Sequence, residues 1–208
     1  ATGPAGPTGA PGGAFDVELV DALCDVGGTL GILFPASFAC PSKTMFTSSV
    51  PFSAALGGLV GADEKCQTLA VNAGLVGTYK AWLSDSTGSP STTFTPSTIP
   101  YYTVTGRRIA NNWTDLTDGT LDAAPVVDEF GVTLPAGGPP GFGGAWTGTN
   151  TDGTPATIVA AATCNDWTLA IAGTSGGRGV YTAANSSWTS NSGISCNVNT
   201  RHLYCFEQ

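Results

Sequence analysis

The sequence predicts an α+β fold whose helices come early and whose second half is built from short strands. Leu59, Ala62 and Cys66 recur at the three- and four-residue spacing of one helical face. Gly74 follows where such a helix would end. Beyond residue 121 this periodicity is lost, and short apolar runs alternate with Gly, Asn, Asp and Ser turns, which indicates strands. Charged residues make up only 11% of the chain, whereas ordinary soluble domains contain roughly 25%. This composition is typical of a secreted, loop-rich protein.

These patterns give an order of elements for a head domain over residues 43–208. A half-buried strand is predicted at 78–84, because Tyr79, Ala81 and Leu83 alternate there with Lys80 and Trp82. Most of the five tryptophans are expected in the core, because large aromatic side chains in a small β-rich domain are usually buried. The other predicted elements are a strand at 43–52, a helix within 56–74, a hairpin over 101–109 that turns at Gly106, a short helix begun by Asn111 or Asn112, and strands at 145–148, 156–164, 167–173, 179–183 and 202–208.

Residues 1–13 carry a different repeat. Glycine occupies every third position, at Gly3, Gly6, Gly9 and Gly12, with prolines between them. Only glycine fits at the crowded axis of a collagen triple helix, so the repeat predicts a collagen-like segment and, with it, a homotrimer. We expect the repeat to be the last turns of a longer stalk; the alternative is a Pro/Gly-rich leader that matches the period by chance. Residues 14–42 are then expected to form a connector hairpin between stalk and head.

Six cysteines indicate three disulfides and an oxidising compartment, which places the protein outside the cell or on its surface. They are Cys24, Cys40, Cys66, Cys164, Cys196 and Cys205. Zinc is the alternative, but the chain contains no CxxC pair and only one histidine, so the clustered ligands of a zinc site are missing. Six cysteines allow fifteen pairings, and their spacing does not choose among them.

Charge and hydropathy exclude two kinds of interaction. The formal net charge is -8, with seven Lys and Arg residues, which leaves no basic surface to bind the phosphates of nucleic acid. No run of about eighteen or more apolar residues occurs, so the sequence predicts no membrane span in this chain.

Few residues suggest a metal site or catalysis. Asn150 and Asp152 lie in an oxygen-rich TNTDGT segment that could hold a structural calcium ion, but a turn capped by the same side chains is the preferred explanation. No other cofactor is expected. The single histidine, His202, lies three residues before a cysteine and has no evident nucleophile and acid to work with. We therefore expect the protein not to be an enzyme.

Six segments of the head share one pattern: ADEKCQTLAVNAGLVGTYKAWLSDS, NNWTDLTDG, WTGTNTDG, ATCNDW, GISCN and LYCFE. Together they resemble the endostatin domain at the C-terminus of certain collagens and, more closely, its bacterial relatives, the endostatin-like outer-membrane proteins. The resemblance covers about residues 43–208 and implies a C-type-lectin-like fold. It also implies nested disulfides, Cys66 with Cys205 and Cys164 with Cys196, which leaves Cys24 with Cys40.

The chain also departs from that family. Animal endostatin binds zinc through an N-terminal histidine cluster and heparin through surface arginines, whereas this chain has one histidine near its far end and few basic residues. Neither activity is carried over. No Glu-Pro-Asn or Gln-Pro-Asp motif of sugar-binding lectins occurs, so the implied fold does not by itself imply sugar binding.

Repeat, cysteines and resemblance together predict an extracellular structural or adhesive protein. A trimerising head on a collagen-like stalk would present binding loops or build a surface fibre, and its partners would be other copies of the chain in a homotrimer or filament. The alternative is a surface receptor for host proteins, extracellular-matrix proteins or glycans. A secreted hydrolase is the least favoured of the alternatives.

Overall fold

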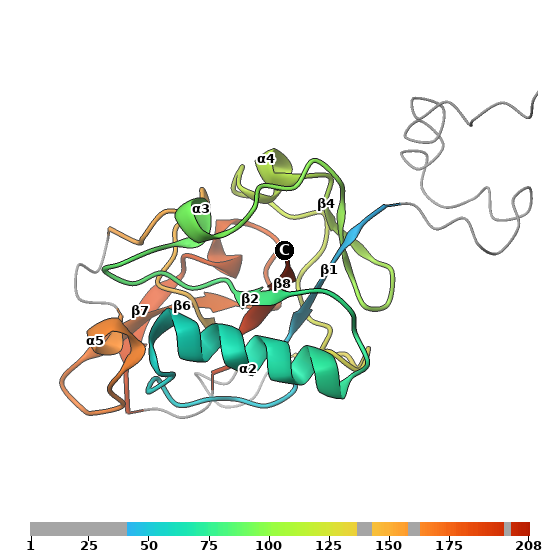
Figure 1. Cartoon of the computed structure of the whole chain (residues 1–208). Coiled ribbons are helices and arrows are strands. Elements are labelled where there is room, and N and C mark those ends of the chain that lie inside the picture. Colours follow the sequence, from blue (N-terminus) through green and yellow to red (C-terminus); the bar gives the residue numbers. More distant parts are fainter. Residues whose placement is uncertain (1–40, 137–142, 158–162, 198–200) are drawn as a thin grey trace, which may run out of the picture. The chain divides into compact units, whose positions relative to one another are not determined.

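A computed structural model describes residues 41–136, 143–157, 163–197 and 201–208. The chain divides after residue 41 into two units, and the second, Ser42–Gln208, is described below (Figure 1). The collagen-like glycines, Cys24 and Cys40 lie outside the described residues. The second unit is α+β, as predicted. Its elements are β1 (Lys43–Thr47), α2 (Gly58–Asn72), β2 (Tyr79–Ala81), α3 (Pro90–Thr93), β3 (Tyr101–Thr103), β4 (Arg108–Ala110), α4 (Trp113–Leu116), β5 (Gly144–Trp146), α5 (Cys164–Trp167), β6 (Ser175–Val180), the 3-10 helix η1 (Ser186–Trp188), β7 (Ser192–Ser195) and β8 (Tyr204–Glu207).

The larger sheet brings the first and last strands of this unit together. Its strand order is β2-β8-β1-β3-β4. Strand β8 pairs antiparallel with β1, with Met45 opposite Phe206, while β1 runs parallel to β3. Strands β3 and β4 form the hairpin predicted over 101–109, and it turns through Gly106, whose φ of 79° lies in the region that favours glycine. That prediction is confirmed.

Helix α2 packs against β2 and β8 (Figure 1). Its buried residues Ala62, Cys66 and Ala70 recur every fourth position, so they lie on one face. Beyond the helix, Gly74 takes a φ of 74°, and the Leu75 N–H donates to the Ala70 carbonyl at 2.9 Å. This is the usual glycine-dependent helix ending, and it confirms the helix that the apolar spacing predicts.

A smaller sheet, in the order β5-β6-β7, lies in the C-terminal half. His202, two residues before β8, joins the two sheets. Its N–H donates to the Gly144 carbonyl, and its carbonyl accepts from the Trp146 N–H, both at 3.0 Å. The predicted strands at 145–148 and 179–183 overlap β5 and the end of β6. The rest of β6 and all of β7 were not predicted, since their Gly and Ser residues have low strand propensity.

The two strands expected on either side of residue 165 are wrong in their described parts. Cys164–Trp167 instead form one left-handed turn, with φ values of 50°, 55°, 52° and 58°. Such backbone costs roughly 1–2 kcal/mol for each residue with a side chain, so the turn needs tertiary anchors. The disulfide from Cys164 to Cys196 is one, and the Trp167 indole N–H, which donates to the Ser84 carbonyl at 2.8 Å, is another.

Two clusters of buried side chains form the core. The first centres on Trp82, whose ring centroid lies 5.0 Å from that of Trp188 and 5.6 Å from that of Phe206. The second contains both described disulfides together with Trp146 and Trp167. These four tryptophans are 0% exposed, which confirms that most tryptophans are in the core. The half-buried strand predicted at 78–84 is therefore wrong at Trp82, because aromatic side chains cover that face as well.

Candidate functional site

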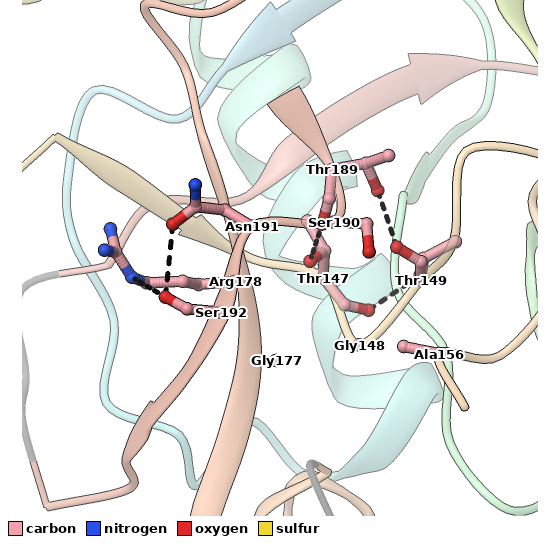
Figure 2. Close-up of a pocket in the computed structure, with 10 residues that line it drawn as sticks. All are labelled: Thr147, Gly148, Thr149, Ala156, Gly177, Arg178, Thr189, Ser190, Asn191 and Ser192. Atoms are coloured by element: carbon pink, nitrogen blue, oxygen red, sulfur yellow. Dashed lines mark hydrogen bonds between the residues drawn. The ribbon is translucent and has the colours of Figure 1, made fainter. Parts of the chain in front are cut away.

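A small pocket opens where the loop after β5 meets the end of η1 and the start of β7 (Figure 2). Its volume is about 60 Å³, which is room for a few water molecules and far below the roughly 300–1,000 Å³ of sites for drug-sized ligands. Ten residues line it, all labelled in Figure 2. The pocket can therefore hold one small chemical group, such as the end of a larger ligand.

Three buried threonines form the floor of the pocket. Thr147 Oγ1 donates to the Thr189 carbonyl at 2.6 Å, Thr149 Oγ1 donates to the Thr147 carbonyl at 2.7 Å, and Thr189 Oγ1 donates to the Thr149 carbonyl at 3.0 Å. The Trp82 indole N–H donates to Thr189 Oγ1 at 2.7 Å, which ties the floor to the aromatic core. Since each hydroxyl proton is used inside the protein, the floor is rigid and offers shape more than donors.

The rim carries the hydrogen-bond donors. Arg178 Nε donates to Ser192 Oγ at 3.2 Å, and Ser192 Oγ donates to Asn191 Oδ1 at 3.1 Å (Figure 2). These bonds orient a guanidinium and an amide, whose other N–H groups suit the acceptor oxygens of a carboxylate or a sugar. None of the described lining residues is acidic, a histidine or a cysteine. The arrangement suits the binding of a group that carries acceptor oxygens.

A larger, more open cavity of about 310 Å³ lies beside α2. Its lining includes Val50, Phe52 and Leu69. The neighbouring Lys65 ammonium donates to the Leu56 carbonyl at 2.9 Å and lies 6.0 Å from the centre of the Phe52 ring. Lys65 is the one cation among the described residues that line this cavity, and a backbone carbonyl of the same chain already binds it. The smaller pocket, whose guanidinium has further N–H groups to offer, is therefore the better candidate site.

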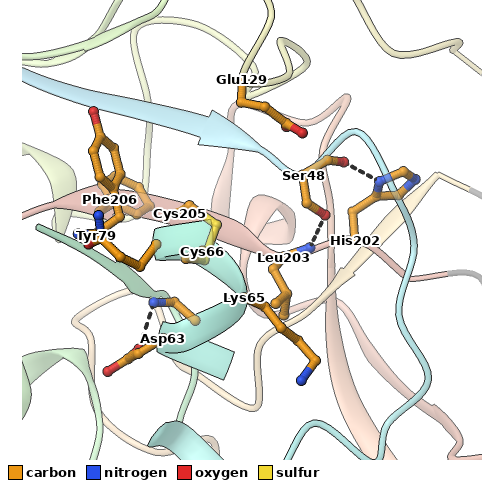
Figure 3. Close-up of a disulfide and its surroundings, with 12 residues drawn as sticks. Ser48, Asp63, Lys65, Cys66, Tyr79, Glu129, His202, Leu203, Cys205 and Phe206 are labelled. Atoms are coloured by element: carbon orange, nitrogen blue, oxygen red, sulfur yellow. Dashed lines mark hydrogen bonds between the residues drawn. A yellow bond between two sulfur atoms is a disulfide. The ribbon is translucent and has the colours of Figure 1, made fainter. Parts of the chain in front are cut away.

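His202 is placed as a structural residue. Its Nδ1 lies 2.6 Å from the Ser48 carbonyl (Figure 3), and because a carbonyl only accepts, Nδ1 carries the proton. Burial lowers the pKa of His202, so the ring is neutral near pH 7. The Ser48 hydroxyl accepts from the Leu203 N–H at 2.9 Å, away from the ring. In the described part of the chain no serine hydroxyl is hydrogen-bonded to this imidazole, so no Ser-His pair is formed.

Two disulfides close the head. Cys66 is joined to Cys205, which links α2 to β8 (Figure 3), and Cys164 is joined to Cys196. The resemblance to endostatin implies these same two pairs, whereas spacing alone left the choice open. Two disulfides are compatible with an extracellular protein.

Asn150 and Asp152, the candidate calcium ligands, both serve a turn. Asp152 Oδ1 accepts from the N–H of Thr154 at 2.9 Å and from its hydroxyl at 2.6 Å. Asn150 Nδ2 donates to the Pro155 carbonyl at 2.9 Å. Calcium sites gather six or more oxygens, and across the described ranges no group of three or more His, Cys, Asp or Glu residues is placed to hold a metal. The turn accounts for these two residues.

A scan against family models and a search of curated proteins each found no match to this chain. Of the helices within the described ranges, none is long and apolar enough to span a membrane. Fold and site therefore define a disulfide-bonded α+β domain with a small, donor-rimmed pocket. Sequence reasoning missed the pocket, although one signal was present: Arg178 is the single charged residue between Asp166 and Arg201.

Proposed function

We propose that the protein is an extracellular structural or adhesive protein, whose head, carried on a collagen-like stalk, binds and assembles. The observation that carries this is the chemistry of the pocket, where Arg178 and Asn191 offer donors above a threonine floor. General acid–base catalysis needs a titratable group of matched pKa within hydrogen-bond reach of the reacting atom. The described lining supplies none, so it is suited to hold a group and not to convert it.

The head is the part that would trimerise or polymerise, on the C-type-lectin-like, endostatin-like fold that the sequence resembles. The nested disulfides and the pairing of β1 with β8 support this, because they fix both ends of the head to one sheet. A stalk that enters at β1 is then attached to a rigid element. Heads that associate would raise the local concentration of the stalk chains and start the triple helix in register.

The stalk is tested by Gly6→Ala, which breaks one triplet and leaves the head untouched. Circular dichroism of the wild type should show the triple-helix signal with a cooperative melt, and the variant should lose much of it because no side chain fits at the axis. Near-ultraviolet spectra should report the same folded head in both proteins. Identical triple-helix signals in the two proteins, or none in the wild type, would contradict the stalk.

A surface receptor for matrix proteins or glycans is the second candidate, and Arg178 favours it. A guanidinium binds a carboxylate through two parallel hydrogen bonds, so a ligand with an exposed carboxylate fits this rim. Immobilised polysaccharides with and without uronate groups are the probe. Arg178→Gln should lose binding to the uronate polysaccharide, while Arg107→Gln, which removes an exposed arginine outside the pocket, should keep it. Equal binding by both variants would contradict this role.

A further inference from the structure

The outer edge of β2 is closed by helix α2. The N–H groups of Tyr79 and Ala81 point away from β8 and donate to Gln67 Oε1 and Asp63 Oδ1, both at 2.8 Å. Figure 3 shows Asp63 and Tyr79 beside the disulfide that fixes the helix to the sheet. Because exposed edges are templates for pairing with other chains, this contact removes one of them.

The outer edges of β4 and β5 are also occupied. The Ile109 carbonyl in β4 accepts from the Asp122 N–H at 2.9 Å. In β5 the backbone of Gly144 and Trp146 is bonded to that of His202, at 3.0 Å in each case. Three of the four edges of the two sheets are therefore covered by contacts within the head.

The edge of β7 differs. The Thr147 N–H donates to the Gly177 carbonyl at 3.0 Å, so the backbone groups of Gly177 face β5. Gly193 lies directly opposite Gly177, and in an antiparallel pair its N–H and C=O must then point away from β6. Ser195 points the same way, because strand direction repeats every second residue. No described residue hydrogen-bonds to the backbone of Gly193 or Ser195, so this edge is open.

Nothing in the local sequence protects the open edge. Natural edges are guarded by charged side chains, prolines or bulges, but β7 is Ser-Gly-Ile-Ser and residues 179–200 contain neither charge nor proline. The two outward-facing residues, Gly193 and Ser195, carry at most a small side chain, so another backbone can approach them closely. The nearest charge among the described residues is Arg178, whose Nε donates to Ser192 Oγ at the first residue of β7. In a chain of net charge -8, an edge without acidic side chains is where two copies meet with least repulsion.

We propose that β7 pairs antiparallel with β7 of a second copy of this chain, across a two-fold axis through Ile194. In this register Gly193 of each copy lies opposite Ser195 of the other, and the outward groups of both form hydrogen bonds. A shift of one residue would set outward groups against inward ones and lose these bonds. The contact is self-complementary, as a two-fold interface must be. It does not rest on the function proposed above.

The side chain of Ile194 lies at the centre of this contact. It is partly buried against the disulfide-containing core cluster and partly exposed. At the axis it faces its counterpart, in a position where Cα atoms approach to about 4.5 Å. One short strand buries far less than the roughly 800 Å² per partner of a stable complex. The pairing is therefore weak, and the fraction of paired chains rises with protein concentration.

Amide hydrogen exchange of the full, non-reduced chain tests the proposal, over about a hundredfold range of concentration. The Gly193 and Ser195 amides should exchange more slowly as concentration rises, while the inward Ile194 amide should not change. Ile194→Lys puts two like charges at the axis and should abolish the concentration dependence. Val60→Lys, which adds the same charge to an exposed apolar position of α2, should keep it.

A second variant guards against a folding defect in Ile194→Lys. Gly193→Pro deletes one outward N–H and no inward one, and should also abolish the concentration dependence at Ser195. The proposal would be overturned if the Gly193 and Ser195 amides exchanged at the same rate at every concentration. Uniformly fast exchange would mean that the edge stays unpaired, and uniformly slow exchange would mean that the same chain covers it. A concentration dependence that survives both variants would also overturn the proposal.

Discussion

Removing the Cys66–Cys205 disulfide should destabilise the head more than removing the Cys164–Cys196 disulfide. The first closes a loop with a sequence separation of 139 and the second one of 32. In the loop-entropy description these closures restrict the unfolded chain by about 5 and about 3.7 kcal/mol, a difference of about 1.3 kcal/mol. All four cysteines are 0% exposed, so Cys→Ala changes leave similar cavities and their packing losses nearly cancel.

Urea unfolding of the non-reduced proteins measures the difference. The double variants Cys66→Ala/Cys205→Ala and Cys164→Ala/Cys196→Ala are compared with the wild type, using the fluorescence of the buried tryptophans. Both variants should also have larger m-values, because an unfolded chain with one bridge fewer exposes more surface.

The reverse order of stabilities would refute the reasoning. If Cys164→Ala/Cys196→Ala is the less stable protein, the shorter bridge acts mainly in the native state. It would then hold the left-handed turn at Cys164–Trp167, whose backbone is costly on its own. Equal free energies of unfolding for the two double variants would likewise show that loop length does not determine how much each disulfide stabilises the head.

Three further predictions concern single residues. Gly179→Ala should cost about 1–3 kcal/mol or more in urea unfolding, because its Cβ would lie 1.8 Å from the Trp188 carbonyl oxygen. Gly143→Ala, whose Cβ would have the Tyr181 ring at 3.9 Å as its nearest contact among the described residues, should be nearly neutral; equal losses would contradict the clash. His202→Asn keeps a donor near Nδ1 but cannot titrate. Burial lowers the folded pKa of His202 below its ordinary 6.5, so wild-type stability should fall as the pH drops from 6.5 toward that pKa, and a variant with the same slope would contradict this. Asp63→Ala should cost about 1–3 kcal/mol by leaving a strand N–H without its acceptor. Asp63→Asn keeps the acceptor and should be close to wild type, also because burial raises the pKa of Asp63 and so disfavours its charge; similar losses in both would contradict the edge contact.

Helix α2 and the β3–β4 hairpin could be predicted from the sequence, because residues close together in the chain determine them. The apolar spacing in α2 and the glycine after it act within a few residues, and so does Gly106 in the β3–β4 hairpin. Both could be predicted because neither depends on a distant partner.

The rest depends on contacts between distant residues. Strands β6 and β7 are rich in Gly and Ser, and they are strands because β5 and each other's backbone hold them. The apolar run at 167–173 follows a left-handed turn that a disulfide and a buried indole fix. The isolated charge of Arg178 was the one local signal for the pocket. The shape of the pocket has no local signal, because its floor joins Thr147 and Thr189, which are far apart in the chain.

The native mass of the non-reduced 208-residue chain, measured by light scattering coupled to size exclusion, tests the central claim most directly. A head and stalk that assemble predict three times the chain mass of 20.9 kDa, or a larger species built from such trimers. A monomer at every concentration would contradict the claim, since a lone chain can neither form a triple helix nor build a fibre.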